Sequence, residues 1–240
     1  MHTWHIHIEG QVQGVGFRPF VFVLAQQMKL NGWVNNTVDG VHIVFNAPTA
    51  AAHDFQQAIL ANAPQLSRIT AIHKNKIQQK FFDNFQIIHS EAAGTAKLLL
   101  TPDFALCEDC RNEIKNPDNR RLGYAFTTCT NCGPRFSIVH ALPYDREQTS
   151  METFHMCEFC ESEYQNPKDR RYYSQTNSCA SCGIQMHLID PAMDTVVSGS
   201  DIIDAVVALW RQGKIVAIKG IGGYLLTCDA QNEKAVNELR

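Results

Sequence analysis

The cysteines carry the strongest chemical signal in this chain of 240 residues. Eight of the nine cysteines form four Cys-x-x-Cys pairs, and Cys228 stands alone. Each half of the set contains two pairs separated by 18 residues, a spacing typical of a zinc site with four thiolates. Four thiolates leave no open position on Zn²⁺, so we expect two structural zinc ions. The expected ligands are Cys107, Cys110, Cys129, Cys132, Cys157, Cys160, Cys179 and Cys182.

The two halves of the cysteine set are copies of one unit. The pattern that begins at Cys107 begins again at Cys157, a period of 50 residues. The copies also share Glu108/Glu158, Glu113/Glu163, Asn116/Asn166, Pro117/Pro167, Arg120/Arg170, Arg121/Arg171 and Gly133/Gly183. A fixed period with shared side chains indicates a duplication. We therefore predict four-cysteine fingers at 105–135 and 155–185.

Spacing alone leaves open which cysteine pairs share a zinc ion. The simplest arrangement joins the pairs within each repeat, and an interleaved arrangement is also geometrically feasible. His155 precedes Cys157 by two residues, but we interpret it as a bystander because the eight cysteines pair off without it. Redox-active Cys-x-x-Cys pairs are the main chemical alternative, and four pairs in duplicated units disfavour them.

A glycine-rich loop near the N-terminus is the second chemical candidate. It contains Val12, Gln13, Gly14, Val15 and Gly16, and Arg18 follows it. Glycines allow several main-chain N–H groups to converge on one anion, and a helix N-terminus adds its dipole. A guanidinium can hold two phosphate oxygens at once. From spacing alone, a plain glycine-rich turn with a surface arginine explains these residues equally well.

A family resemblance decides between these two interpretations. The segment Gly10-Gln-Val-Gln-Gly-Val-Gly-Phe-Arg18, followed by Gly32-Trp-Val-Asn-Asn-Thr37, resembles both motifs of the acylphosphatase family, and the resemblance covers residues 1–90. It implies that the loop and Arg18 bind the phosphate of an acyl phosphate and that Asn36 positions the attacking water. The plain alternative for Asn36 is a turn-capping residue before Asp39-Gly40.

The elements around these residues alternate between strands and helices. Apolar alternation predicts a strand around Trp4–Ile8, and helical spacing predicts helices at about 18–30 and 50–62. The turn signal at Asp39-Gly40 predicts a hairpin of 33–37 with 41–45, and further strands are expected near 67–77 and 84–89. The order is β-α-β-β-α-β. We predict an α+β fold, the ferredoxin-like acylphosphatase sandwich, with an antiparallel sheet and two helices on one face.

The remaining segments are a linker and the start of an α/β domain. Residues 91–104 contain a small, polar stretch typical of a linker, and a weaker boundary is expected at Pro191–Ser200. Within residues 199–240 the sequence pattern predicts a helix at 201–212, a strand at 215–218 and a glycine-rich turn at 220–223. About 40 residues of this kind rarely bury a core of their own, so we expect an incomplete domain.

The order of these parts resembles the hydrogenase maturation carbamoyltransferases of the HypF family. The resemblance includes Lys219-Gly-Ile-Gly-Gly-Tyr224 and implies that 199–240 begins a YrdC-like nucleotide-binding domain. It further implies carbamoyl phosphate as substrate, ATP only in the context of a complete YrdC-like domain, and a HypE-type acceptor protein. We expect that this chain alone does not carry out the full transferase reaction. Hydrolysis of an acyl or carbamoyl phosphate is expected of residues 1–90.

Composition limits the partners. The net charge is −3 with an isoelectric point near 6.3, which disfavours nucleic acid as a partner. We interpret the arginine doublets at 120–121 and 170–171 as a solvated face or as carboxylate partners. The sequence shows neither a secretory signal nor a membrane span, so we expect a cytoplasmic protein. The competing function is a non-catalytic zinc module that binds RNA or protein, with a degenerate acylphosphatase scaffold.

Overall fold

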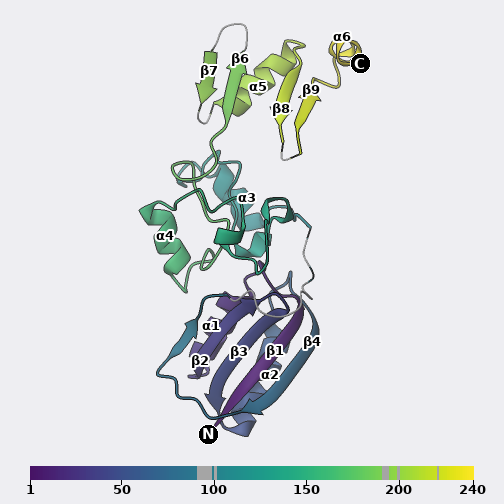
Figure 1. The fold of residues 1–240 in the computed structure, drawn as a ribbon. Coiled ribbons are helices and arrows are strands. Elements are labelled where there is room, and N and C mark those ends of the chain that lie inside the picture. Colours follow the sequence, from purple (N-terminus) through teal and green to yellow (C-terminus); the bar gives the residue numbers. More distant parts are fainter. Residues whose placement is uncertain (91–98, 100–101, 191–194, 199–200, 221) are drawn as a thin grey trace. The chain divides into compact units, whose positions relative to one another are not determined.

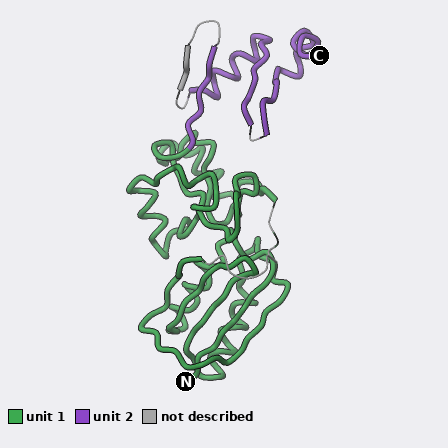
Figure 2. Tube along the Cα trace, viewed as in Figure 1, with its two compact units in different colours: residues 1–183 green, residues 184–240 purple. Residues whose placement is uncertain are grey.

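The computed structural model describes residues 1–90, 99, 102–190, 195–198, 201–220 and 222–240. The chain divides into two compact units, Met1–Gly183 and Ile184–Arg240 (Figure 2). The first unit contains both the predicted first domain and the cysteine repeats. The second unit begins ahead of the predicted start at residue 199. Most of the predicted linker at 91–104 and of the boundary at 191–200 lies outside the described residues.

The first domain has the predicted β-α-β-β-α-β order (Figure 1). Its elements are β1 (His2–Gln11), α1 (Phe17–Gln27), β2 (Asn31–Thr37), β3 (Gly40–Ala47), α2 (Thr49–Asn62), β4 (Arg68–Ile77) and β5 (Phe85–Ile87). The strand order is β4-β1-β3-β2-β5, and β5 pairs parallel with β2. The sheet is therefore mixed, and the prediction of an antiparallel sheet was wrong at this edge. The reason is that the chain crosses the sheet from β4 at one edge to β5 at the other, where β5 runs parallel to β2.

One core holds this domain together. Ile6 and Ile8 of β1, which are fully buried, belong to the same apolar cluster as Phe55 and Ile59 of α2. The alternate residues His5, His7 and Glu9 of β1 are only partly buried. This alternation is the period of a strand with one face covered by helices, and it leaves a second face partly open to solvent.

The cysteine repeats contain short helices set between ligand loops. Each repeat has one eight-residue helix, α3 (Glu108–Lys115) or α4 (Glu158–Gln165), that begins directly after its first cysteine. Short 3₁₀ turns at Thr130–Cys132, Phe136–Ile138 and Arg146–Gln148 shape the first repeat and the segment between the repeats. Because such modules bury little apolar surface, a metal ion is their natural source of folding energy.

In its described residues, the second unit contains two hairpins and two helices. Its elements are β6 (His187–Asp190), β7 (Thr195–Ser198), α5 (Ile202–Arg211), β8 (Val216–Lys219), β9 (Tyr224–Thr227) and α6 (Glu233–Leu239). The helix predicted at 201–212 and the strand predicted at 215–218 correspond to α5 and β8. Among the described residues, no helix is both long and apolar enough to span a membrane.

Candidate functional site

The glycine-rich loop connects β1 to α1 and presents free main-chain donors. Gly14 and Gly16 adopt φ angles of 70° and 75°, which only glycine adopts readily. The first main-chain bond of α1 runs from Phe20 N–H to Gly16 O at 3.0 Å. Within the described part of the chain, the N–H groups of Gly14, Val15 and Gly16 donate to no main-chain acceptor. A helix N-terminus with free donors in the preceding loop is suited to bind an anion.

Arg18 and Asn36 meet at this loop. Arg18 lies in the first turn of α1 and is 7% exposed, and Asn36 lies on β2 and is 1% exposed. With its carboxamide oxygen turned toward the guanidinium, Asn36 accepts hydrogen bonds from Arg18 Nε at 3.0 Å and Nη2 at 3.2 Å. The two predicted catalytic residues are thus in contact, although they come from different elements.

The other predicted loop residues have mainly structural side chains. Val12 and Val15 are buried in the core of the first domain. The amide of Gln13 donates to Thr37 O at 2.7 Å and to Gly40 O at 2.9 Å. Gln13 thereby ties the loop to the turn between β2 and β3, and only main-chain groups of this loop remain available to a phosphate.

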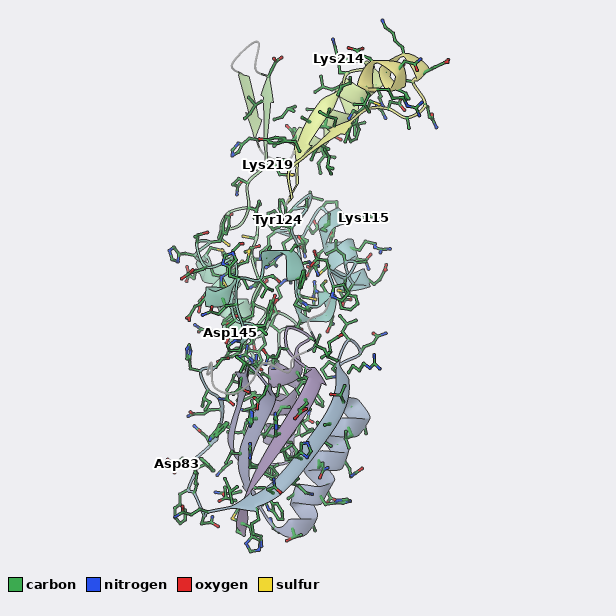
Figure 3. All side chains as sticks on the ribbon, turned by 45° about the vertical axis from the view of Figure 1, so that its right-hand side comes forward. Asp83, Lys115, Tyr124, Asp145, Lys214 and Lys219 are labelled. Atoms are coloured by element: carbon green, nitrogen blue, oxygen red, sulfur yellow. The ribbon has the colours of Figure 1, made fainter. Side chains whose placement is uncertain are left out.

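Two further partners of Arg18 lie far from the loop in sequence. Arg18 Nη1 donates to Ser90 Oγ at 2.9 Å, and Arg18 Nη2 donates to Asp145 Oδ1 at 2.5 Å. Asp145 belongs to the segment between the two cysteine repeats (labelled in Figure 3). The ring of Tyr173 lies 5.9 Å from the guanidinium carbon. No sequence pattern indicated these residues, because no local motif marks a contact that spans 127 positions.

The cysteine repeats cover the loop. A Cβ atom added to Gly14 would lie 2.6 Å from the Cβ of Pro134, so the first repeat packs directly on the loop backbone. Tyr144 N–H donates to Gln13 Oε1 at 3.0 Å. The cavity at the loop offers about 20 Å³ to the centres of water molecules, roughly room for one water. A phosphate therefore fits only if side chains that line this cavity, such as Tyr144 or Tyr173, move.

Arg18 also lines a second, larger cavity. It has a volume of about 220 Å³, and Arg18, Asp145 and Tyr173 line it together with residues 87–90 at the end of the first domain. Arg18 and Tyr173 line both cavities. Arg18 therefore borders both the narrow cavity at the loop and the wider cavity.

The eight predicted ligands form two clusters, each within one repeat. Cys107, Cys110, Cys129 and Cys132 make up the first, and Cys157, Cys160, Cys179 and Cys182 make up the second. Five Sγ–Sγ distances lie between 3.6 and 4.0 Å. Four sulfurs placed tetrahedrally at 2.3 Å from a zinc ion are about 3.8 Å apart, so the clusters fit Zn²⁺. This geometry excludes the interleaved arrangement, and His155 lies outside both clusters, as predicted.

The arginine doublet of each repeat binds a glutamate of the other repeat. Arg121 of the first repeat is 1% exposed and binds Glu163 of the second, with Nη1 2.9 Å from Oε1. Arg171 of the second repeat binds Glu113 of the first in the same way. The doublets are thus carboxylate partners, which is one of the two predicted interpretations. The guanidinium groups of Arg121 and Arg171 are buried against these carboxylates, whereas Arg120 and Arg170 remain partly exposed.

The same doublets also contact the cysteine clusters. Arg120 Nη2 donates to Cys160 Sγ at 3.3 Å, and Arg170 Nη1 donates to Cys110 Sγ at 3.1 Å. Burial alone would raise the pKa of Glu163, but its hydrogen bonds from Arg121 and Arg120 outweigh burial and lower the pKa to about 2. Each repeat therefore supplies positive charge to the thiolates of the other, which stabilises a dianionic four-thiolate zinc site.

Comparison with protein families assigns three parts of the chain. Residues 4–87 match the acylphosphatase family, and residues 106–139 and 156–189 match the family described as the HypF finger. Residues 208–240 match the family described as Telomere recombination. The three matches follow the order of the predicted domains.

Individual relatives cover either the whole chain or its first domain. The carbamoyltransferase HypF of Synechocystis sp. is 46% identical over 241 residues, which are 100% of this chain and 31% of the relative. An acylphosphatase of Pseudothermotoga lettingae is 34% identical over 89 residues, 37% of this chain and 99% of the relative. A solved structure of full-length HypF in a phosphate- and nucleotide-bound form matches 100% of this chain and 31% of its own, with 42% identity and a TM-score of 0.90. The chain thus spans less than a third of these HypF relatives.

Proposed function

The chain belongs to the HypF family, whose N-terminal region it represents, and on that basis we propose that its first domain hydrolyses acyl phosphates, with carbamoyl phosphate as the substrate. The observation that carries the proposal is the contact between Arg18 and Asn36 beside a loop with free N–H groups. This arrangement joins a phosphate-binding cation to an amide that can orient water.

The proposed reaction needs no titratable base. The phosphoryl oxygens bind the loop N–H groups and Arg18, which spread the developing charge. A water molecule held by the carboxamide of Asn36 attacks phosphorus, a P–O bond to water forms, and the P–O bond to the acyl group breaks. The carboxylate or carbamate leaves with the bonding electrons, and the water's proton passes to solvent or phosphate. The rate gain comes from positioning and electrostatic stabilisation.

The fingers are part of the proposed active site. Pro134 and Tyr144 pack on the loop, and the carboxylate of Asp145 accepts a hydrogen bond from Arg18. We assign Zn²⁺ to both cysteine clusters in a structural role, because four thiolates leave no position for substrate. In this assignment, zinc fixes the wall that closes the phosphate pocket.

The wider reaction is a further part of the proposal. The relatives are named carbamoyltransferases, so we infer that carbamate released at Arg18 is consumed by an ATP-dependent carbamoyl transfer to a HypE-type acceptor protein. ATP would bind a complete YrdC-like domain, of which 208–240 match the start. We place the protein in the reducing cytosol, where eight metal-binding thiols remain unoxidised.

Phosphate release by the full chain from benzoyl phosphate and from carbamoyl phosphate tests the hydrolysis. Arg18→Ala and Asn36→Ala should each lower kcat/KM by about 100-fold or more. Arg68→Ala and Asn62→Ala serve as matched controls, because both side chains are exposed and lie outside the pocket. Unchanged hydrolysis in folded Arg18→Ala protein would remove the proposed function.

A further inference from the structure

Three histidines form a row across the partly open face of the sheet. His7 of β1 lies directly opposite His42 of β3 and also directly opposite His73 of β4. Residues in register on neighbouring strands point to the same face. The alternate residues Ile6 and Ile8 point into the helix-covered core, so the histidines occupy the other face of the first domain.

Asp39, in the turn between β2 and β3, meets two of these histidines. Its Oδ1 lies 3.1 Å from Nε2 of His42, and its Oδ2 lies 3.6 Å from Nε2 of His7. One ligand atom from each of His7, Asp39 and His42 falls within 4.8 Å of the others, and all three residues are partly exposed. An ion could therefore reach two imidazole nitrogens and one carboxylate oxygen from solvent.

We propose that His7, Asp39 and His42 bind Zn²⁺ at a third metal site, separate from the two cysteine clusters. Two imidazoles and a carboxylate form a donor set that suits Zn²⁺ and other borderline divalent ions. Three protein ligands leave a fourth position for water, unlike the closed four-thiolate sites.

Neighbouring groups already orient these ligands. Nδ1 of His42 lies 2.8 Å from Nε2 of His5, so a tautomer that donates this bond leaves Nε2 of His42, facing Asp39, free for a metal. The hydroxyl of Thr37 donates to Oδ1 of Asp39. Hydrogen bonds of this kind fix the tautomer and direction of metal-binding side chains.

Asn35 adds an observation that the fold alone leaves unexplained. It lies directly opposite His42 in the sheet and is 2% exposed. Its Oδ1 is buried and has no hydrogen-bond partner among the described residues. A buried oxygen without a hydrogen-bond donor is destabilising. An ordered water bound to an ion in this row would offer such an oxygen a donor.

Binding requires a small rearrangement of two rings. The rings of His7 and His42 are stacked, with centroids 4.2 Å apart and an angle of 9° between planes. A metal ion lies in the plane of each imidazole that binds it, so at least one ring must turn about its Cβ–Cγ bond. Partial exposure leaves room for that rotation.

The site would stiffen the turn that anchors the phosphate loop. Gln13 of the loop donates to Thr37 O and Gly40 O, which flank the turn that carries Asp39. An ion shared by Asp39, His7 and His42 fixes this turn to β1 and β3. The metal proposal itself does not depend on hydrolysis by the loop.

Zinc stoichiometry of the full chain tests the proposal. After two equivalents have filled the cysteine clusters, a third should bind in competition with a chromophoric chelator. His42→Gln and Asp39→Asn should weaken the third equivalent at least tenfold and leave the first two unchanged. His73→Gln is the matched control, because His73 shares the row and lies outside the ligand set. Asp39→Asn keeps the turn, since Asn-Gly is itself a favoured hairpin sequence.

Cobalt substitution identifies the ligands of each equivalent. Two equivalents of Co²⁺ should show thiolate-to-metal charge transfer, and the third should add only visible ligand-field bands, which disappear in His42→Gln. Binding of only two equivalents by the wild type overturns the proposal. A third equivalent that keeps its affinity in folded Asp39→Asn and His42→Gln overturns it as well.

Discussion

Asp145 Oδ1 lies 2.5 Å from Arg18 Nη2, so a carboxylate from the segment between the two fingers is hydrogen-bonded to the guanidinium that follows the glycine-rich loop. The side chains of Arg18 and Asp145 are only 8% and 18% exposed, so solvent screens this ion pair weakly. An incoming phosphate must share Arg18 with this carboxylate or displace it. The finger region is therefore positioned to set the affinity of the pocket.

Asp145→Asn should tighten binding of inorganic phosphate to the full chain by about tenfold. The substitution removes a negative charge beside the phosphate and a charge-assisted hydrogen bond that competes for Arg18, which is worth about 1.5–3 kcal/mol. Calorimetric titration with phosphate measures the change. Glu147 lies two residues further along the chain, and its side chain is exposed. Glu147→Gln removes the same charge there and should have little effect on phosphate binding. Weaker binding in Asp145→Asn would mean that Asp145 positions Arg18 for phosphate.

Gly14→Ala should destabilise the first unit by about 3 kcal/mol and abolish phosphate binding. A left-handed φ angle costs an alanine about 1 kcal/mol, and overpacking against Pro134 adds about 2 kcal/mol. Gly123→Ala is the matched control, because its φ of 69° equals that of Gly14 within a degree while nothing lies within 4 Å of the added Cβ. Urea unfolding should show a loss of only about 1 kcal/mol for Gly123→Ala. Equal losses in the two variants would contradict close packing of the finger on the loop.

Glu163→Gln should destabilise the pair of fingers by about 3 kcal/mol at neutral pH, because it leaves the buried guanidinium of Arg121 without its carboxylate partner. Arginine pairing lowers the pKa of Glu163 from 4.5 to about 2, so the carboxylate stabilises the fold fully above about pH 4.5. This stabilisation is lost as the pH falls toward 2. The unfolding free energies of wild type and Glu163→Gln should therefore converge over that range, with zinc content measured at each pH. Glu158→Gln, in an exposed position on the same helix, should match the wild type throughout.

Removal of zinc from the cysteine clusters should abolish phosphate binding as well as unfold the fingers. The reason is that Pro134 and Thr130 of the first repeat pack against Gly14 and Gly16. Phosphate titration before chelation, after chelation and after return of two equivalents of zinc measures the effect. His42→Gln protein should lose and regain phosphate binding in the same way, which would assign the effect to the fingers. Undiminished phosphate affinity in chelator-treated protein would separate the pocket from the fingers.

Features within single motifs could be predicted from the sequence. Glycines at 14 and 16 and Arg18 indicated a candidate anion loop at a helix N-terminus, and the resemblance of its motif to acylphosphatases favoured that interpretation over a plain turn. The period of 50 residues sufficed to predict two four-cysteine units. These features follow from spacing within one motif, where chain connectivity alone brings the residues close together.

The tertiary structure decided every relationship between distant segments. The contact of Asp145 with Arg18, the packing of Pro134 on Gly14 and the exchange of arginines between repeats all depend on how separately formed elements pack. The grouping of His7 with His42 depends on strand register, and a shift of one residue would send either histidine to the opposite face. Such contacts leave no periodic trace in a single sequence, because their partners lie tens to more than a hundred positions apart.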